Sequence, residues 1–382
     1  MNIAGRLEQA RRKGARLFRA PGRVNIIGEH TDYSEGLVLP VNTGLYTWIE
    51  AMPRDDRTVT LRSKNLDAAG SFSLDELAPP GNPDWIAYVM GVMAELEREG
   101  IRLPGADLEI DGEIPLGGGL SSSASLEVAV ASAILGLAGR SLPAARCAAL
   151  CQQAEQRYAG VNCGIMDQFS VAAGKPGRAM LLDCRTLESE FVELPDTLAM
   201  IVTDSGAKHA LADSDYNDRR DDCAEATRRL AELDASVSTL RDVSRDLLET
   251  GADRLGEKTY RRSRHVVTEI ERVTKAFKAI GAGDLDELGA LVSDSHRSLR
   301  DDFEVSCEEI EALVAIADSC SGVFGSRMIG GGFGGCVLSI VAVEYAAAVA
   351  AYIGDRYGRL LGKPPWIHTV EPAASAGEVT MS

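Results

Sequence analysis

The chain has 382 residues, of which 45% are hydrophobic and 25% are charged. This length suits two packed domains, and the composition is that of an ordinary folded protein rather than a disordered one. The formal net charge of -17 argues against a nucleic-acid partner, so local donors must meet any anionic substrate. No apolar run approaches the roughly 18 residues of a membrane span, and the first residues lack an apolar core of signal-peptide length. We expect a cytoplasmic protein with no membrane partner.

Residue patterns in the first half of the chain predict a mixture of strands and helices. A helix up to about residue 14 is followed by a short strand over 16–20, which ends at the turn-forming Pro21-Gly22. Further strands are predicted within 24–28, 37–50, 57–62 and 107–110. A loop rich in Gly, Pro, Asn and Asp is predicted over 70–84. Helices are predicted over 85–99, 123–137 (mostly apolar and therefore buried) and 142–158 (amphipathic).

The second half changes character. Residues 178–203 predict alternating strands and turns, and from about residue 215 the pattern is that of charged helices. These charged helices are predicted over 215–234, 258–280, 284–298 and 306–319, and a further helix is predicted over 343–357. Strands are predicted over 336–342 and 366–370. The shift near residue 195 divides the chain into domains 1–195 and 196–382, and the lack of strict β-α alternation predicts an α+β fold.

Eight cysteines are scattered along the chain without a CxxC spacing. Cys147 and Cys151 lie one helical turn apart, as a metal site would require, but small buried side chains on a helix are the simpler interpretation. The pattern predicts no disulfide framework.

A glycine- and serine-rich segment, Pro115–Ser125, opens directly into the apolar helix predicted over 123–137. Glycine lets the backbone approach a ligand closely, and a helix start offers unpaired N–H groups and the positive end of the dipole. Together these features favour a phosphate site, and a serine hydroxyl there can ligate magnesium. A capped helix after a flexible turn remains the alternative. The segment is not a Walker A loop, because GxxxxGK[ST] is absent.

A second glycine-rich segment, Gly330–Cys336, formally contains GxGxxG. A dinucleotide-binding site needs a strand before this motif and a helix after it. Here a strand-like run follows, which argues against a nicotinamide-dependent oxidoreductase. The glycines are better explained by close approach of the backbone to a ligand or to the first glycine-rich segment.

Two further segments carry polar side chains next to apolar ones. Glu29–Tyr33 offers carboxylates, an imidazole and hydroxyls that suit the vicinal hydroxyls of a sugar, although a polar loop facing water fits the pattern slightly better. Asp167 lies in an otherwise apolar stretch, where a buried carboxylate needs a partner. It is a candidate general base, with a helix cap as the alternative.

These segments, in this order, resemble the galactokinases of the GHMP kinase superfamily. APGRVNIIGEHTDY at 20–33 is similar to the galactokinase signature, while PLGGGLSSSAS at 115–125 and SRMIGGGFGGC at 326–336 resemble the second and third superfamily motifs. Residues 152–169, 214–220 and 295–306 also resemble galactokinases. The resemblance implies a two-domain GHMP kinase fold, with a ribosomal-protein S5-like N-terminal domain, a ferredoxin-like C-terminal domain and the active site between them.

The resemblance also implies an activity, which is transfer of the γ-phosphate of ATP to the C1 hydroxyl of galactose with Mg²⁺ as cofactor. Asp167 and Arg23 match the catalytic pair. Asp167 also belongs to the implied sugar contacts, with Glu29, His30, Asp32, Gly164 and Tyr216. The implied ATP phosphate loop is Gly117, Gly118, Gly119, Leu120, Ser121, Ser122 and Ser123. Ser123 and Glu155 match the magnesium ligands, and Trp85 matches an aromatic residue near adenine.

Two alternatives remain within this resemblance. The acceptor could be a related sugar such as N-acetylgalactosamine, arabinose or a uronic acid, because acceptor choice depends on pocket shape. A non-catalytic sensor of galactose and ATP is the other, but Ser121–Ala124 and Asp167 are all present. We expect a monomer with galactose and ATP as its ligands.

Overall fold

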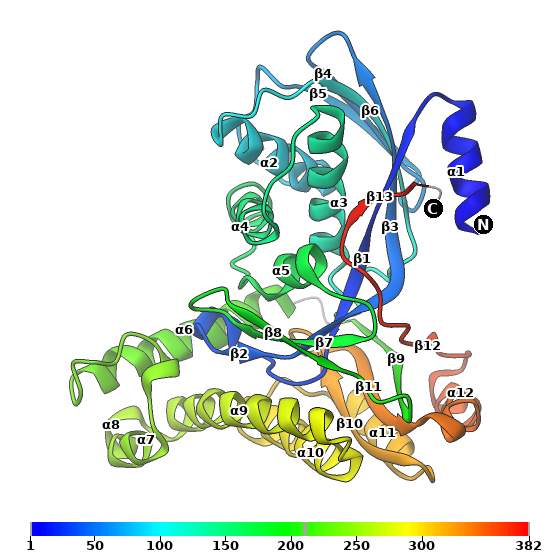
Figure 1. The fold of residues 1–382 in the computed structure, drawn as a ribbon. Coiled ribbons are helices and arrows are strands. Elements are labelled where there is room, and N and C mark those ends of the chain that lie inside the picture. Colours follow the sequence, from blue (N-terminus) through cyan, green and yellow to red (C-terminus); the bar gives the residue numbers. More distant parts are fainter. Residues whose placement is uncertain (1, 209–211, 381–382) are drawn as a thin grey trace.

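The computed structural model describes residues 2–208 and 212–380. Its upper half in Figure 1 is built on a six-stranded sheet with the order β13-β1-β3-β6-β4-β5. All neighbouring strands of this sheet are antiparallel except β4 and β6. The strands are β1 (Arg16–Asn25), β3 (Pro40–Arg54), β4 (Thr58–Ser63), β5 (Ala68–Ser73), β6 (Gly105–Gly112) and β13 (Gly377–Glu378).

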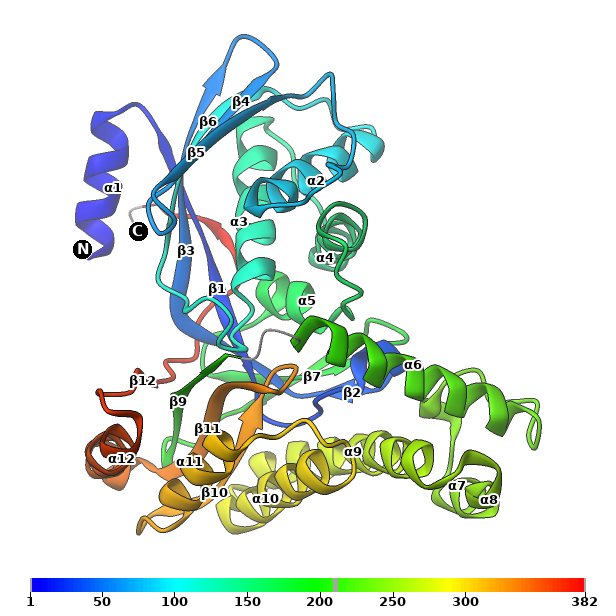
Figure 2. The same cartoon turned by 180° about the vertical axis from the view of Figure 1, so that it is seen from behind.

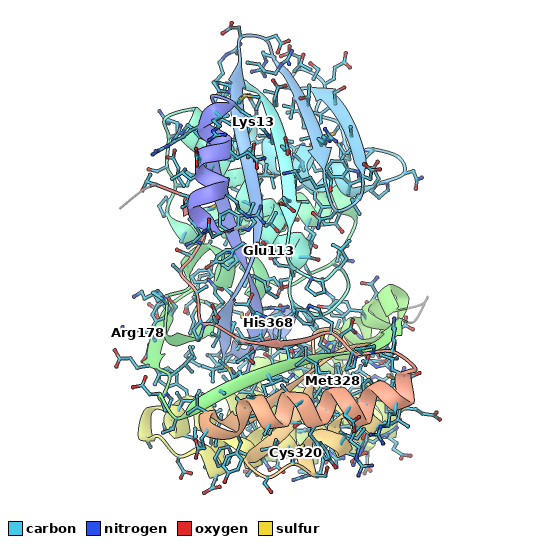
Figure 3. The ribbon with its side chains drawn as sticks, turned by 90° about the vertical axis from the view of Figure 1, so that its right-hand side faces the viewer. Lys13, Glu113, Arg178, Cys320, Met328 and His368 are labelled. Atoms are coloured by element: carbon cyan, nitrogen blue, oxygen red, sulfur yellow. The ribbon has the colours of Figure 1, made fainter. Side chains whose placement is uncertain are left out.

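Helices cover both faces of this sheet unequally. On one face lie α2 (Trp85–Arg98), α3 (Ser122–Leu137), α4 (Ala144–Ala154) and α5 (Met166–Ala173). Apolar side chains of α2, α3 and α4 form one core cluster with those of the strands, which explains why the sequence of α3 is apolar almost all round. The short α1 (Ile3–Arg12) lies on the opposite face, and Figure 3 shows its end at Lys13.

The lower half contains a four-stranded antiparallel sheet with the order β10-β11-β9-β12. The strands are β9 (Leu198–Lys208), β10 (Val323–Ile329), β11 (Gly334–Ala342) and β12 (Ile367–Thr369). Helices separate the first strand from the second and the third from the fourth, which is the ferredoxin-like βαββαβ pattern. This order and the upper sheet confirm the predicted α+β class.

Helices of the second half cover both faces of the lower sheet (Figure 2). They are α6 (Ala212–Ala231), α7 (Arg245–Thr250), α8 (Ala252–Leu255), α9 (Glu257–Ala282), α10 (Leu285–Asp301) and α11 (Glu308–Asp318). α12 (Ala346–Leu361), seen across the front of the sheet in Figure 3, packs beside α11, and its Tyr357 hydroxyl donates to the Glu309 carbonyl of that helix. Apolar side chains of α11 and α12 share a core cluster with one face of the sheet, and those of α9 and α10 share a cluster with the other face.

A third, small sheet connects the halves. Its strands are β2 (Leu37–Val38), β7 (Arg178–Asp183) and β8 (Ser189–Glu193), in the order β2-β7-β8. Apolar residues of β1, β7, β9, β10 and α9 share one core cluster, so the two halves pack on each other through a continuous apolar layer. After β12 the chain returns to the upper sheet, where β13 pairs with β1.

The structure corrects several predicted boundaries. The expected turn at Pro21-Gly22 is wrong, because β1 continues to Asn25 and accommodates the proline as a register shift against β3. The expected loop over 70–84 begins as β5, whose small residues complete the sheet edge. The helix predicted over 142–158 ends at Ala154 and continues as a π-helical turn over Glu155–Ala159. Sequence analysis did not predict α5 or β10.

In the described ranges, every helix is either too short or too polar to cross a bilayer. All eight cysteines are free, and Cys147 and Cys151 are both buried in α4, where they belong to the core cluster of the upper sheet. The packing interpretation of this pair is therefore confirmed.

Candidate active site

A cavity of about 380 Å³ lies where the two halves of the molecule meet. It brings together residues from the end of β1 and the segment after it, from the starts of α3, α5 and α6, and from the loop between β10 and β11. Its lining residues are Arg23, Glu29, His30, Asp32, Gly117, Gly119, Ser121, Ser122, Ser123, Glu155, Val161, Cys163, Gly164, Met166, Asp167, Tyr216, Gly330, Gly331 and Gly332. All the polar segments singled out in the sequence therefore converge on one space.

Asp167 and Arg23 form the central pair of this cavity. Arg23 Nε donates to Asp167 Oδ1 over 2.8 Å, and Arg23 Nη2 lies 2.6 Å from the same oxygen. The Ser121 hydroxyl donates to the other carboxylate oxygen. The Arg23 side chain is 5% exposed whereas that of Asp167 is 27% exposed, so the carboxylate faces the cavity while the guanidinium holds it from behind.

The first glycine-rich segment forms a loop that ends at the start of α3. Gly117 and Gly119 have φ angles of 75° and 73°, which a residue with a side chain rarely adopts. Ser121 is the N-cap of α3 and also has a positive φ, so the backbone N–H groups that follow it lack helical partners. The arrangement suits an anion such as phosphate.

Two residues of the expected phosphate loop do not line the cavity. The Leu120 side chain is buried in the apolar layer between the halves, and its carbonyl accepts a hydrogen bond from the Arg23 N–H. Gly118 faces the other way, where an added Cβ would lie 3.3 Å from Cys336 Sγ. Both therefore shape the loop from behind.

The segment Glu29–Tyr33 is not the water-facing loop that its polarity slightly favoured. Glu29, His30 and Thr31 are all buried. Glu29 Oε1 accepts from the Gly330 N–H over 2.9 Å and lies 3.2 Å from Arg327 Nη2, while Oε2 accepts from Asn25 Nδ2. The protein itself thus holds much of the Glu29 carboxylate.

His30 is a neutral imidazole with a defined tautomer. Nε2 lies 3.1 Å from the Gly331 carbonyl oxygen, which can only accept, so Nε2 carries the proton. Nδ1 then accepts from the Tyr33 hydroxyl over 3.1 Å. Burial lowers the pKa of His30 to about 3, which keeps the ring uncharged.

Asp32 and Gly164 meet at the cavity wall. An added Cβ on Gly164 would lie 1.9 Å from Asp32 Oδ2, so only glycine leaves room for this carboxylate. Burial, followed by the like charge of Asp167, raises the pKa of Asp32 to about 6. Tyr216 lines the cavity opposite, with its ring 5.4 Å from that of His30.

We expect Gly164→Ala to raise the KM for the sugar by about tenfold or more, because the new methyl group displaces the Asp32 carboxylate and its hydrogen bonds. The KM for the nucleotide should stay unchanged. Gly354→Ala, whose nearest neighbour would lie 3.5 Å away, is the matched control and should leave both KM values unchanged. An unaltered sugar KM in Gly164→Ala would contradict a role for Asp32 in sugar binding.

Ser123 and Glu155, which derive from different helices, also meet in the cavity. Both residues line the cavity, and the Cys163 thiol donates to Glu155 Oε2 over 3.2 Å. Burial raises the pKa of Glu155. Two hard oxygen donors side by side fit Mg²⁺, which takes few protein ligands and keeps waters and phosphate oxygens. Within the described ranges, no cluster of three or more His, Cys, Asp or Glu side chains could hold a metal ion.

The second glycine-rich segment contacts both the first glycine-rich segment and the residues Glu29 and His30. It turns between β10 and β11, so a strand rather than a helix follows it, as predicted. An added Cβ on Gly330 would lie 2.8 Å from Gly119 Cα, which confirms the expected close approach to the first glycine-rich segment. Gly330, Gly331 and Gly332 also line the cavity, although they were not among the expected site residues; their density of glycine was the available signal.

A neighbouring cavity of about 320 Å³ lies on the other side of the α3 start. Ser122 and Ser123 line both cavities, so the two spaces share the start of this helix. The second one is walled mainly by apolar and aromatic side chains, including Trp85, Tyr88 and Leu116. A flat heteroaromatic ring fits such a lining.

Comparisons with known proteins agree with this geometry. Three family models match the chain: the GHMP kinases N terminal domain over residues 87–175, the galactokinase galactose-binding signature over 8–53, and the GHMP kinases C terminal over 276–358. The fold and the site thus define a GHMP kinase.

Individual relatives show to which family of GHMP kinases the chain belongs. The chain is 44% identical over 346 residues to galactokinase from Bos taurus, covering 88% of this chain and 86% of the relative. Galactokinase from Chloroflexus aggregans is 44% identical over 351 residues, with 91% and 90% covered. The crystal structure of Lactococcus lactis galactokinase complexed with galactose has 35% identity, a TM-score of 0.92 and 99% of both chains covered. This chain belongs to the galactokinase family.

Proposed function

We propose that this protein transfers the γ-phosphate of ATP to the C1 hydroxyl of galactose, giving galactose 1-phosphate and ADP. The observation that carries the proposal is the Asp167 carboxylate, which is held by Arg23 and Ser121 at the start of α3, in the same cavity as Asp32 and His30. Backbone N–H groups that can bind phosphate and side chains that can bind sugar hydroxyls thus lie next to one proton acceptor, Asp167. The galactokinase relatives support the choice of sugar.

In the proposed reaction Asp167 accepts or orients the proton of the sugar C1 hydroxyl. Arg23 holds this carboxylate through its Nε and Nη2 groups and adds positive charge near the transferring group. The remaining sugar hydroxyls are bound by five residues that line the cavity, namely Glu29, His30, Asp32, Gly164 and Tyr216. Phosphoryl transfer gains most from such positioning and electrostatic stabilisation, because charge spreads over the phosphoryl oxygens in the transition state.

The nucleotide is proposed to lie across the shared start of α3. Gly117–Ser123 would receive the phosphates through backbone N–H groups and the helix dipole. The apolar cavity beside Trp85 and Tyr88 would receive the adenine. Ser123 and Glu155 are the proposed magnesium ligands, and the bound ion would neutralise phosphate charge.

The first test is release of ADP with ATP, Mg²⁺ and a panel of galactose, N-acetylgalactosamine, glucose and arabinose at equal concentrations. Fast turnover with galactose alone is expected. Preference for another sugar would replace the acceptor, and no turnover with any sugar would favour the sensor.

The pH dependence offers a second test. We expect kcat/KM for galactose to fall as the pH drops through about 6, because Asp32 then takes up a proton and accepts sugar hydrogen bonds less well. His30, with a pKa of about 3, should not contribute to this change. Asp32→Asn should lower kcat/KM and abolish this decline.

The same carboxyl group affects stability with the opposite sign to an ordinary ion-paired aspartate. Its pKa is raised on folding from 3.8, so the folded state binds this proton more tightly, and the contribution of Asp32 to stability decreases as the pH rises from about 4 to 6. For the kinetic test, a decline of kcat/KM at low pH that persists in Asp32→Asn would assign the decline to a titrating group other than Asp32.

We also propose that the protein works as a monomer in the cytoplasm, with the chain divided into domains near residue 195. The eight free cysteines suit a reducing compartment. Light scattering after size exclusion tests the oligomeric state.

A further inference from the structure

One buried carboxyl group beside the cavity has no part in the proposed reaction. Glu127 lies on α3, one turn after Ser123, and is fully buried. Its Oε2 accepts a hydrogen bond from Gln168 Nε2 over 2.9 Å, while Oε1 has no hydrogen-bond partner among the described residues. Burying a carboxyl group with so few partners is costly, so a hydrophobic side chain would be the cheaper choice for packing alone.

The Gln168 side chain connects Glu127 to Glu155. Gln168 follows Asp167 on α5 and is itself fully buried. The same Nε2 that donates to Glu127 also donates to Glu155 Oε2, over 2.6 Å. An amide NH₂ group has two hydrogens, so each carboxyl group receives one of them. Two carboxyl groups therefore fix the orientation of the amide. Glu155 lines the cavity, and Glu127 does not.

We propose that Glu127 is a positioning residue that acts through Gln168 to hold the Glu155 carboxylate beside Ser123. The inference rests on the proposed role of Glu155 as a magnesium ligand. Without the Glu127 acceptor, the Gln168 amide can rotate, and Glu155 loses the shorter of the two hydrogen bonds that Gln168 and Cys163 donate to its Oε2. Partners behind a ligating group commonly change metal affinity by about 10- to 100-fold.

The test measures the affinity for a non-hydrolysable ATP analogue by calorimetry, with and without Mg²⁺, and the affinity for galactose. In Glu127→Leu we expect the gain in nucleotide affinity that Mg²⁺ produces to fall by about tenfold, while the metal-free affinity and the galactose affinity stay unchanged. Glu127→Gln keeps an oxygen that can accept from Gln168, so it should stay within about threefold of the unmodified protein.

Two further variants separate positioning from general loss of packing. Val130→Ala, at a fully buried site on the same helix, should lower stability but leave the Mg²⁺ dependence unchanged. Gln168→Leu removes the connection itself and should reproduce the effect of Glu127→Leu, with no further loss in the double variant. Gln168→Leu also carries the test if Glu127→Leu does not fold.

An unchanged Mg²⁺ dependence in Glu127→Leu, or in Gln168→Leu when only that variant folds, would overturn the inference. Galactose affinity that falls as much as nucleotide affinity would also overturn it. The variant Glu155→Ala distinguishes failure of the positioning role of Glu127 from failure of the proposed role of Glu155 as a magnesium ligand. If Glu155→Ala loses the Mg²⁺ effect and Glu127→Leu does not, only the positioning role is wrong. If neither variant loses it, Glu155 is not a magnesium ligand.

Discussion

Asp167→Ala is expected to lower kcat for galactose phosphorylation by about three orders of magnitude, with little change in ATP affinity. A positioned proton acceptor typically contributes a factor of about 10² to 10⁴, and the substitution also leaves the buried Arg23 guanidinium without its carboxylate. Steady-state kinetics with both substrates, together with calorimetric binding of an ATP analogue, measure the two effects. Near-normal turnover would remove Asp167 from the catalytic role.

Asp167→Asn distinguishes the two roles that the carboxylate can have. Its amide oxygen can still accept a hydrogen bond from a sugar hydroxyl but cannot take up the proton. A loss as large as that in Asp167→Ala would indicate proton transfer. A loss of tenfold or less would indicate that the group mainly orients the hydroxyl. Thermal unfolding of both variants controls for instability caused by the unpaired Arg23.

Arg327→Met is expected to lower the free energy of unfolding by about 3–5 kcal/mol, because it leaves the buried Glu29 carboxylate without its cation. The Arg327 side chain is 0% exposed and lies 3.2 Å from Glu29 Oε1, and its Nη1 donates to the Ile26 carbonyl. Denaturant unfolding measures the change. Galactose should bind more weakly too, since Glu29 and His30 are anchored to the same loop.

Two further variants serve as controls for the stability loss expected in Arg327→Met. Arg16→Met removes an exposed ion pair with Glu378 and should cost less than about 1 kcal/mol. Adding Glu29→Gln to Arg327→Met removes the buried charge and should restore part of the stability. Equal effects of Arg327→Met and Arg16→Met would show that the buried pair is not important for stability.

Much of the candidate site could be predicted because its parts are local motifs. The glycines and serines of the phosphate loop are adjacent in sequence, and a helix follows them, so their backbone chemistry could be inferred directly. Asp167 was conspicuous as a charge in an apolar stretch. The same local view was misleading for Glu29 and His30, because their polarity suggested water, whereas their partners Gly330 and Gly331 lie 301 residues further along the chain.

The residues that support the site from behind gave no sequence signal. Glu127 occupies a helical position that periodicity alone assigns to packing, and its link to Glu155 depends on how α3 and α5 come together. Arg327 lies in a strand that was itself not predicted, since a short strand before a glycine-rich turn has little periodicity. The strand β5 was missed for a related reason, because its small residues lack β-branched side chains and its pairing with β4 decides its conformation.

The pairing of β13 with β1 has a consequence for synthesis on the ribosome. Phe18 and Arg19 of β1 receive their second neighbour only from Gly377 and Glu378, which are translated after every other described strand. Until then the nascent upper sheet presents β1 as an open edge, and such edges attract strands from other chains. Pairing with Gly377 and Glu378 then covers this part of the edge with residues of the same chain.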